Sequence, residues 1–150
     1  MQFSFREVDK KDEKLLFDWR NDPITRRWSF DDKPILFVNH QKYLKEKILD
    51  KKCLMWIFLL NNEPCGLVRL NIEDKKIILN YLISEKYRGQ KLSSIMLILA
   101  RKKICKLFPK VDIYAYTLPE NVVSIKSLQR AGFTFKGSEI NKKIYLYKCV

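Results

Sequence analysis

The sequence contains little glycine, proline, cysteine or histidine: its 150 residues include four Gly, five Pro, four Cys and one His. With no repeat and no low-complexity stretch, this scarcity excludes collagen-like and disordered chains. No apolar run reaches the roughly 18 residues that a membrane span needs, and the N-terminus lacks the pattern of a signal peptide. We therefore expect a cytoplasmic protein, with residues 1–150 forming a single domain.

The four cysteines show no metal-binding or redox pattern. Cys53, Cys65, Cys105 and Cys149 lie 12, 40 and 44 positions apart, and no two form a C-x-x-C pair. With His40 as the only histidine, no recognisable zinc site exists and we assign no metal ligand. The spacing predicts reduced thiols buried in the core.

Positive charge dominates the composition. The 30 Lys+Arg residues exceed the 17 Asp+Glu residues and give a net charge of +13, which favours anionic partners. No block of five or six like charges occurs, and the aromatic residues do not alternate with arginine as they do on base-stacking surfaces. We therefore expect a phosphorylated small molecule as partner, with no nucleic acid and no membrane.

Hydrophobic periodicity predicts alternating strands and helices in a chain that is 47% hydrophobic. Asp12 and Asn39 are predicted to cap the first two helices. We expect strands at 2–8, 54–60, 65–72, 77–84, 111–117, 133–137 and 142–150, and helices at 12–20, from 39, at 92–107 and at 119–131. This order, β-α-α-β-β-β-α-β-α-β-β, predicts an α/β (α+β) fold with a mixed sheet.

Two segments resemble a known enzyme family. They read NYLISEKYRGQKLSSIMLILA (80–100) and DIYAYTLPENVVSIKSLQRAGF (112–133), and the second contains P-x-N-x-x-S-x-x-x-x-x-x-A-G-F from Pro119 to Phe133. Both are similar to the acetyl-CoA-binding segments of the GCN5-related N-acetyltransferases (GNAT). The predicted order of elements is also that of the GNAT fold, so the resemblance covers nearly the whole chain.

The resemblance implies acetyl-CoA as cosubstrate. A loop of backbone N–H groups that opens a long helix is a natural anion site, so residues 88–94 are expected to wrap the pyrophosphate. Lys91 and Ser93 stand where the family motif has small residues. The implied acetyl-CoA contacts are Leu82, Ile83, Arg88, Gly89, Gln90, Lys91, Leu92, Ser93, Ser94, Asn121, Ser124 and Leu128.

The family's catalytic side chains are only partly present. Leu128 occupies the position where many members carry a tyrosine that protonates the leaving thiolate, and Ile78 occupies a position often held by a glutamate base. Tyr81 and Tyr116, on neighbouring strands, are the candidate substitutes, with water as the alternative. The resemblance also implies an oxyanion donor from a backbone N–H near Leu82.

The N-terminal third resembles GNAT enzymes that acetylate UDP-linked 4-amino-4,6-dideoxy sugars of nonulosonic-acid pathways. The matching pieces are Trp19-Arg20-Asn21 and His40. Arginines can hold a diphosphate bidentately, and Trp28 or His40 can contact a uracil. The implied acceptor residues are Arg20, Asn21, Arg27, Trp28, His40 and Arg69.

Two other functions stay open at this point. The same helix end also resembles ribosomal-protein acetyltransferases, which makes a peptide N-terminus an alternative acceptor. A non-catalytic basic binding module is the alternative from another class, because the charge of +13 suits RNA. A homodimer is compatible with the sequence.

Overall fold

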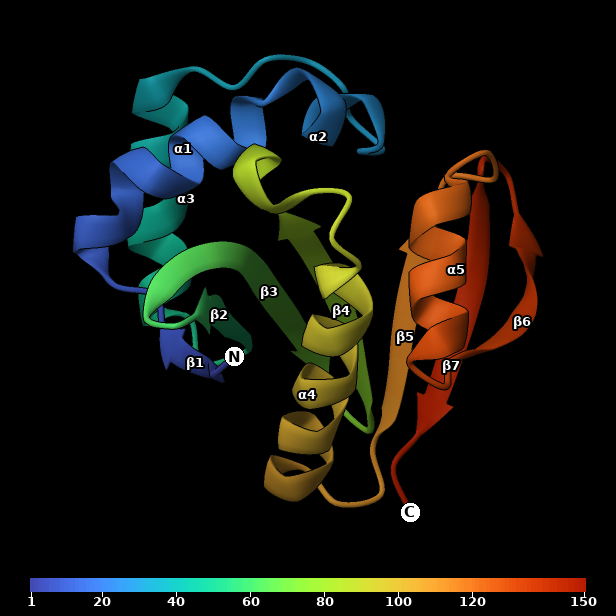
Figure 1. The fold of residues 1–150 in the computed structure, drawn as a ribbon. Helices are drawn as coiled ribbons and strands as arrows, with labels where there is room; N and C mark the ends of the chain where they lie inside the picture. Colours follow the sequence, from blue (N-terminus) through green and yellow to red (C-terminus); the bar gives the residue numbers. More distant parts are fainter.

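Seven strands form one sheet in the computed structural model, which describes residues 1–150 (Figure 1). Their spatial order is β1-β2-β3-β4-β5-β7-β6, and every neighbouring pair is antiparallel except β4 and β5. The predicted mixed sheet is confirmed. The strands are β1 (Phe3–Glu7), β2 (Cys53–Leu60), β3 (Glu63–Glu73), β4 (Lys76–Ile83), β5 (Asp112–Thr117), β6 (Thr134–Glu139) and β7 (Lys142–Lys148).

Helices cover both faces of the sheet. One face carries α4 (Leu92–Leu107) and α5 (Val122–Arg130), which are prominent in Figure 1. The other face carries the N-terminal helices, of which the first and third pack over β2 and β3. These are α1 (Glu13–Asn21), α2 (Pro23–Arg27) and α3 (Phe37–Leu49), and the 3-10 turns η1 (Lys10–Asp12) and η2 (Glu85–Tyr87) complete the chain. No helix has the length and apolar character that a membrane crossing requires.

Strand β2 separates two hydrophobic cores. Because successive side chains of a strand point to opposite faces, Met55 and Ile57 pack against α1 and α3, whereas Trp56 and Phe58 join the core beneath α4. Five consecutive residues, 55–59, are buried. This double burial explains the continuous apolar run LMWIFLL, which the sequence analysis assigned to a strand covered on both sides.

Strands β4 and β5 diverge at one end of the sheet. They pair in parallel from Lys76↔Asp112 to Leu79↔Ala115, and no pairing joins them beyond that point. Their outer neighbours continue further: β3 still pairs with β4 at Ile83, and β7 pairs with β5 at Thr117. The sheet therefore opens into a split between Asn80–Ile83 and Tyr116–Thr117.

Three predictions about the N-terminal helices need correction. Residues 23–27, expected as loop, form α2, because Asp22 accepts a hydrogen bond from the Thr25 N–H and Pro23 suits the first helical position. Helix α3 begins at Phe37, so Asn39 lies inside its first turn. Asp12 precedes α1 but does not cap it, because its carboxylate binds Arg6 and the Asp9 N–H.

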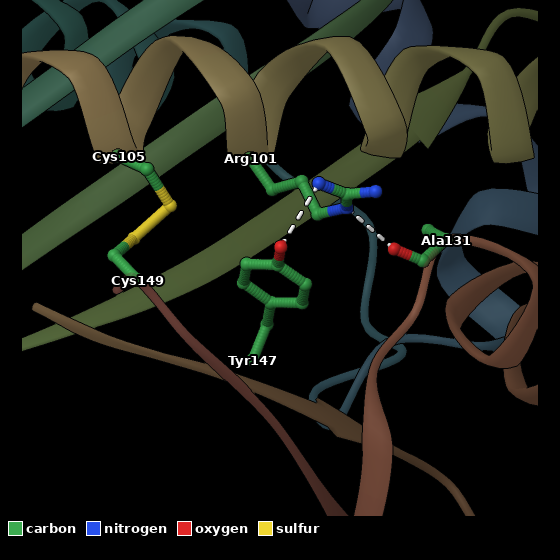
Figure 2. The surroundings of a disulfide bond; sticks show 5 residues. All are labelled: Arg101, Cys105, Ala131, Tyr147 and Cys149. Atoms are coloured by element: carbon green, nitrogen blue, oxygen red, sulfur yellow. Dashed lines mark hydrogen bonds between the residues drawn. A yellow bond between two sulfur atoms is a disulfide. The ribbon is translucent and has the colours of Figure 1, made fainter.

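The cysteine prediction is half wrong. Cys53 and Cys65 are free and buried, as expected. Cys105 of α4 and Cys149 beside the end of β7 form a disulfide, with their Cα atoms 5.2 Å apart (Figure 2). Nearby, Arg101 of α4 donates to the Ala131 carbonyl at the end of α5 and to the Tyr147 hydroxyl of β7, so three bonds tie α4 to the C-terminal part of the chain. The pairing joins residues 44 positions apart and depends on how α4 packs, which the spacing of cysteines does not reveal.

Candidate active site

A cavity of about 760 Å³ occupies the split and extends beneath the N-terminal helices. It brings together most of the residues that the sequence analysis assigned to the site. Those that line it are Arg20, Trp28, His40, Arg69, Tyr81, Leu82, Ile83, Arg88, Gly89, Lys91, Leu92, Ser93, Tyr116, Asn121 and Ser124. Asn21, Arg27, Gln90, Ser94 and Leu128 do not line it.

The loop before α4 presents free backbone donors to the cavity. Lys91 is the N-cap residue of α4, and no side chain accepts a hydrogen bond from the first turn. The first N–H groups of a helix have no partner inside the helix, so they remain available to an anion. This geometry suits the pyrophosphate role predicted for residues 88–94, and the exposed Lys91 adds a positive charge beside it.

Lys91 adopts the left-handed conformation, with φ 60° and ψ 23°. This region favours glycine, the residue expected in the family motif, and costs other residues about 1 kcal/mol. We expect Lys91→Gly to raise the melting temperature and to raise the KM for acetyl-CoA roughly two- to fivefold through the lost charge. Lys91→Ala is the control: it should raise the KM equally without the gain in stability. Thermal unfolding and steady-state kinetics measure both, and an unchanged KM in both variants would contradict the charge role.

Helix α5 contributes polar groups to the opposite wall. Asn121 caps α5 by accepting from the Ser124 N–H, and the Ser124 hydroxyl is hydrogen-bonded to the Tyr81 hydroxyl across the split. Burial raises the pKa of Tyr81 to about 12, partly offset by the bond to Ser124. Tyr81 therefore carries its proton at neutral pH.

Two residues predicted as acetyl-CoA contacts have side chains that do not line the cavity. Leu128 is fully buried in the core cluster, because α5 turns this side chain toward the sheet. The Ser94 side chain is also buried, and its hydroxyl has no hydrogen-bond partner, so its acetyl-CoA contact stays a prediction. Ser93 does line the cavity, and its hydroxyl lies 2.6 Å from the Ser127 hydroxyl, which joins the start of α4 to α5.

Thr117 was missed by the sequence analysis. It is the last residue of β5, it lines the cavity, and its buried hydroxyl has no hydrogen-bond partner. A buried hydroxyl without a partner is costly, so it indicates a ligand that supplies one. The sequence did contain a signal for its burial: alternation along β5 places Thr117 on the same face as the buried Ile113 and Ala115.

The free edge of β4 offers backbone donors, one residue away from the predicted position. The Ser84 N–H donates to the Cys65 carbonyl on β3, and alternate residues of an antiparallel pair repeat this pattern. Since the register is unbroken, the N–H of Leu82 also faces β3. The N–H groups of Tyr81 and Ile83 face the split, where β4 has no partner strand.

Two arginines meet around Tyr43 at the other end of the cavity. The Arg20 guanidinium stacks 4.5 Å from the centre of the Tyr43 ring, and Arg69 Nη1 donates to the Tyr43 hydroxyl at 2.6 Å. Neither arginine forms an ion pair with a carboxylate, and Arg69 Nε is buried without a partner. Burial and the nearby Arg69 charge lower the pKa of Arg20. Tyr43 had no signal in the sequence beyond its helical spacing.

Three residues that were predicted to contact the acceptor have partners within the protein: His40, Asn21 and Arg27. His40 is 1% exposed, its Nε2 donates to the Glu13 carbonyl at 2.9 Å, and burial lowers its pKa. Asn21 bonds the backbone N–H and carbonyl of Ile35. Arg27 stacks on Trp28. The acceptor contacts assigned to these three residues stay predictions, and the structure gives each one a packing role.

A family model described as "Acetyltransferase (GNAT) domain" matches residues 2–134. The chain therefore belongs to the GNAT acetyltransferase family, as the resemblance of its two segments indicated. The match covers β1 to the start of β6, so it includes every wall of the cavity. No curated protein is similar enough in sequence to match the chain.

Solved structures share the fold at low sequence identity. Spermidine N-acetyltransferase from Vibrio cholerae, in complex with CoA and spermine, has a TM-score of 0.85 at 14% identity and covers 97% of this chain and 93% of its own. AAC(6')-Ib in complex with paromomycin and acetyl-CoA has a TM-score of 0.83 at 18% identity, with 97% and 92% covered. A ribosomal L7/L12 alpha-N-protein acetyltransferase, RimL, in complex with CoA has a TM-score of 0.83 at 15% identity, with 99% and 95% covered.

Proposed function

We propose that the protein transfers the acetyl group of acetyl-CoA to the amine of a nucleotide-linked sugar, of the UDP-4-amino-4,6-dideoxy class. Membership of the acetyltransferase family establishes the reaction type and answers the alternative of a non-catalytic basic module. The acceptor is our own inference. It rests on the charge at the acceptor end of the cavity and on the resemblance around Arg20.

The residues present fit acetyl-CoA. The uncapped start of α4 supplies N–H donors for phosphate oxygens, and Lys91 adds charge beside them. The unpartnered Thr117 hydroxyl and the free edge of β4 supply polar groups inside the split. When bound there, acetyl-CoA supplies an activated acetyl group. The backbone N–H groups of Tyr81 and Ile83 would then stabilise negative charge that develops on the acetyl oxygen.

The observation that carries the acceptor proposal is the excess of cations on the cavity wall. Eight Lys and Arg side chains line the cavity against one acidic residue, Asp31. Arg20 and Arg69 both contact Tyr43, and neither has a carboxylate partner. Two partly desolvated guanidinium groups repel each other until an anion binds between them, and a diphosphate provides such an anion.

The same charge argues against polycationic acceptors. Spermine and paromomycin, which occupy two of the similar structures, carry several amines. Such amines are attracted by carboxylates, and this cavity offers a single one. A nucleotide also supplies binding energy remote from the reacting nitrogen, which helps to place the amine against the thioester. A peptide N-terminus remains the competing acceptor, and the assay below includes it.

The proposal predicts a selective loss in Arg20→Ala. A hydrogen bond to a charged group contributes about 1.5–3 kcal/mol, so we expect the KM for the nucleotide sugar to rise roughly ten- to hundredfold. The KM for acetyl-CoA should stay within about twofold, because Arg20 lies at the far end of the cavity. Release of CoA thiol measures both constants. Lys14→Ala is the matched control, since this cationic side chain lies outside the cavity in an exposed ion pair with Asp18.

The acceptor is identified by competition among amines of different charge. The assay compares a UDP-4-amino-4,6-dideoxy sugar, the same amino sugar without UDP, spermidine and an N-terminal peptide. Preference for the UDP-linked sugar is the expected result. Preference for spermidine or for the peptide, or an Arg20→Ala variant that behaves like wild type, would overturn the acceptor and leave the acetyltransferase assignment intact.

A further inference from the structure

Arg88, the arginine of the acetyl-CoA loop, binds a helix on the acceptor side of the cavity. Its Nη2 donates to Asp22 Oδ2 at 2.5 Å and to the Thr25 hydroxyl at 2.8 Å. Asp22 and Thr25 belong to the start of α2, which lies more than 60 positions away in the sequence. In Figure 1, α2 and the segment that leads into α4 lie at the same end of the sheet.

This contact is a shielded ion pair and not a loose surface contact. The side chains of Arg88 and Asp22 are 24% and 12% exposed, so water screens their attraction only in part. The same carboxylate oxygen of Asp22 also accepts a hydrogen bond from the Thr25 N–H. Burial alone would raise the pKa of Asp22, but the hydrogen bonds from Arg88 and from Thr25 outweigh it and lower the pKa.

The pair is the polar connection between α2 and the rest of the protein. All other hydrogen bonds of residues 22–33 are local: Arg26 bonds Asn21 and Asp32, Ser29 bonds Thr25, and Lys33 bonds Asp31. The backbone bonds of α2 are likewise internal. Ile24 and Phe30 are more than half exposed, so apolar packing anchors this segment weakly. Arg88 is therefore the one residue distant in sequence whose hydrogen bonds hold α2 over the cavity.

The segment that Arg88 holds forms the acceptor wall. Ile24, Thr25, Arg26 and Trp28 line the cavity, and so does Arg88 itself. Arg88 Nη1 is buried and has no partner, so one side of the guanidinium is free for a ligand while Nη2 is held by α2. Arg88 therefore belongs to the phosphate loop and also contacts the acceptor wall.

We propose that Arg88 is a positioning residue that couples the two substrates: a CoA phosphate that binds its free Nη1 holds the guanidinium in its bond to Asp22, and so fixes α2 and the acceptor wall. This inference rests on the proposed acetyl transfer. Coupling between two sites is reciprocal, so CoA and the acceptor should each raise the affinity for the other.

Hydrogen exchange with CoA as the probe tests the coupling without a known acceptor. In wild type we expect CoA to slow amide exchange at 89–97, where it binds, and at 23–33 by at least about fivefold. Asp22→Asn keeps a residue that caps α2, but it removes the charge that holds Arg88. In this variant the slowing at 89–97 should persist and the slowing at 23–33 should disappear. Thr25→Val removes the second acceptor of Arg88 but leaves the Asp22 carboxylate in place, so it should lose only part of the slowing at 23–33.

The control is an ion pair of the neighbouring turn η2. Lys86 binds Glu63 in an exposed pair outside the cavity. Lys86→Gln breaks this pair but leaves the Tyr87 hydroxyl bonded to Glu63, so the response at 23–33 should stay unchanged. CoA protection at 89–97 without any at 23–33 in wild type would overturn the inference alone. Equal protection at 23–33 in wild type, Asp22→Asn and Thr25→Val would also overturn it. Absence of protection throughout wild type would overturn the proposed use of CoA, and with it the coupling.

Discussion

Gly66→Ala is expected to lower kcat by roughly a hundredfold, because it displaces the end of β4 that borders the split. A methyl group at this position would lie 2.8 Å from the Leu82 carbonyl oxygen and 2.9 Å from Met96 Sδ. Both neighbours are confined: the first is backbone, and Met96 is a fully buried residue of α4. The strand must therefore shift, and with it the N–H groups of Tyr81 and Ile83.

Gly137→Ala is the matched control for this change. A methyl group there meets no atom within 4 Å, and neither glycine has a positive φ. We expect wild-type kcat in Gly137→Ala, measured with the acceptor that the competition assay selects. Overpacking should cost Gly66→Ala about 1–3 kcal/mol in the free energy of unfolding, so urea unfolding is measured in parallel. A folded Gly66→Ala protein with wild-type kcat would show that the free edge of β4 takes no part in catalysis.

The fold was predictable because its signals are local. Alternation and continuous apolar runs located the strands, and the segment from Pro119 to Phe133 identified the wall formed by α5. Residues 54–60 are all apolar, so the sequence alone predicts that both faces of β2 are buried. The helix starts were predicted less well. Asp12 and Asn39 are residue types that cap helices, yet Asp12 binds Arg6 and Asn39 lies inside α3.

The parts of the site that could not be predicted depend on contacts between distant residues. Nothing near Arg88 in the sequence indicates that Asp22 neutralises it, and nothing near Cys105 indicates Cys149. Arg20 and Arg69 were both expected at the acceptor end, but Tyr43, which holds them together, belongs to a third element. His40 was predicted to face the nucleotide, whereas its hydrogen bond to Glu13 depends on how α3 packs against α1.

Tyr81→Phe is expected to reduce the single-turnover rate by roughly a hundredfold, the lower range for loss of a general acid. Leu128, at the position where many family members carry the acid, is buried in the core and cannot donate a proton. The Tyr81 hydroxyl lines the split and is bonded to Ser124. We propose that it protonates the departing thiolate. Tyr116→Phe should have little effect, because Lys142 lies 4.4 Å from the centre of its ring, a contact that the substitution keeps.

Two further measurements separate acid catalysis from packing. Ser124→Ala removes the hydroxyl that bonds Tyr81 across the split but keeps the tyrosine, so it should retain most of the rate if Tyr81 is the acid. The pH profile gives an independent check. Because the pKa of Tyr81 is raised to about 12, its hydroxyl stays protonated from pH 6 to 10. A tyrosine of ordinary pKa, about 10, would be half deprotonated at pH 10. The wild-type rate should therefore rise as the acceptor amine becomes neutral and then stay level to pH 10. Full single-turnover rates in both Tyr81→Phe and Tyr116→Phe would exclude both tyrosines and leave water as the proton donor.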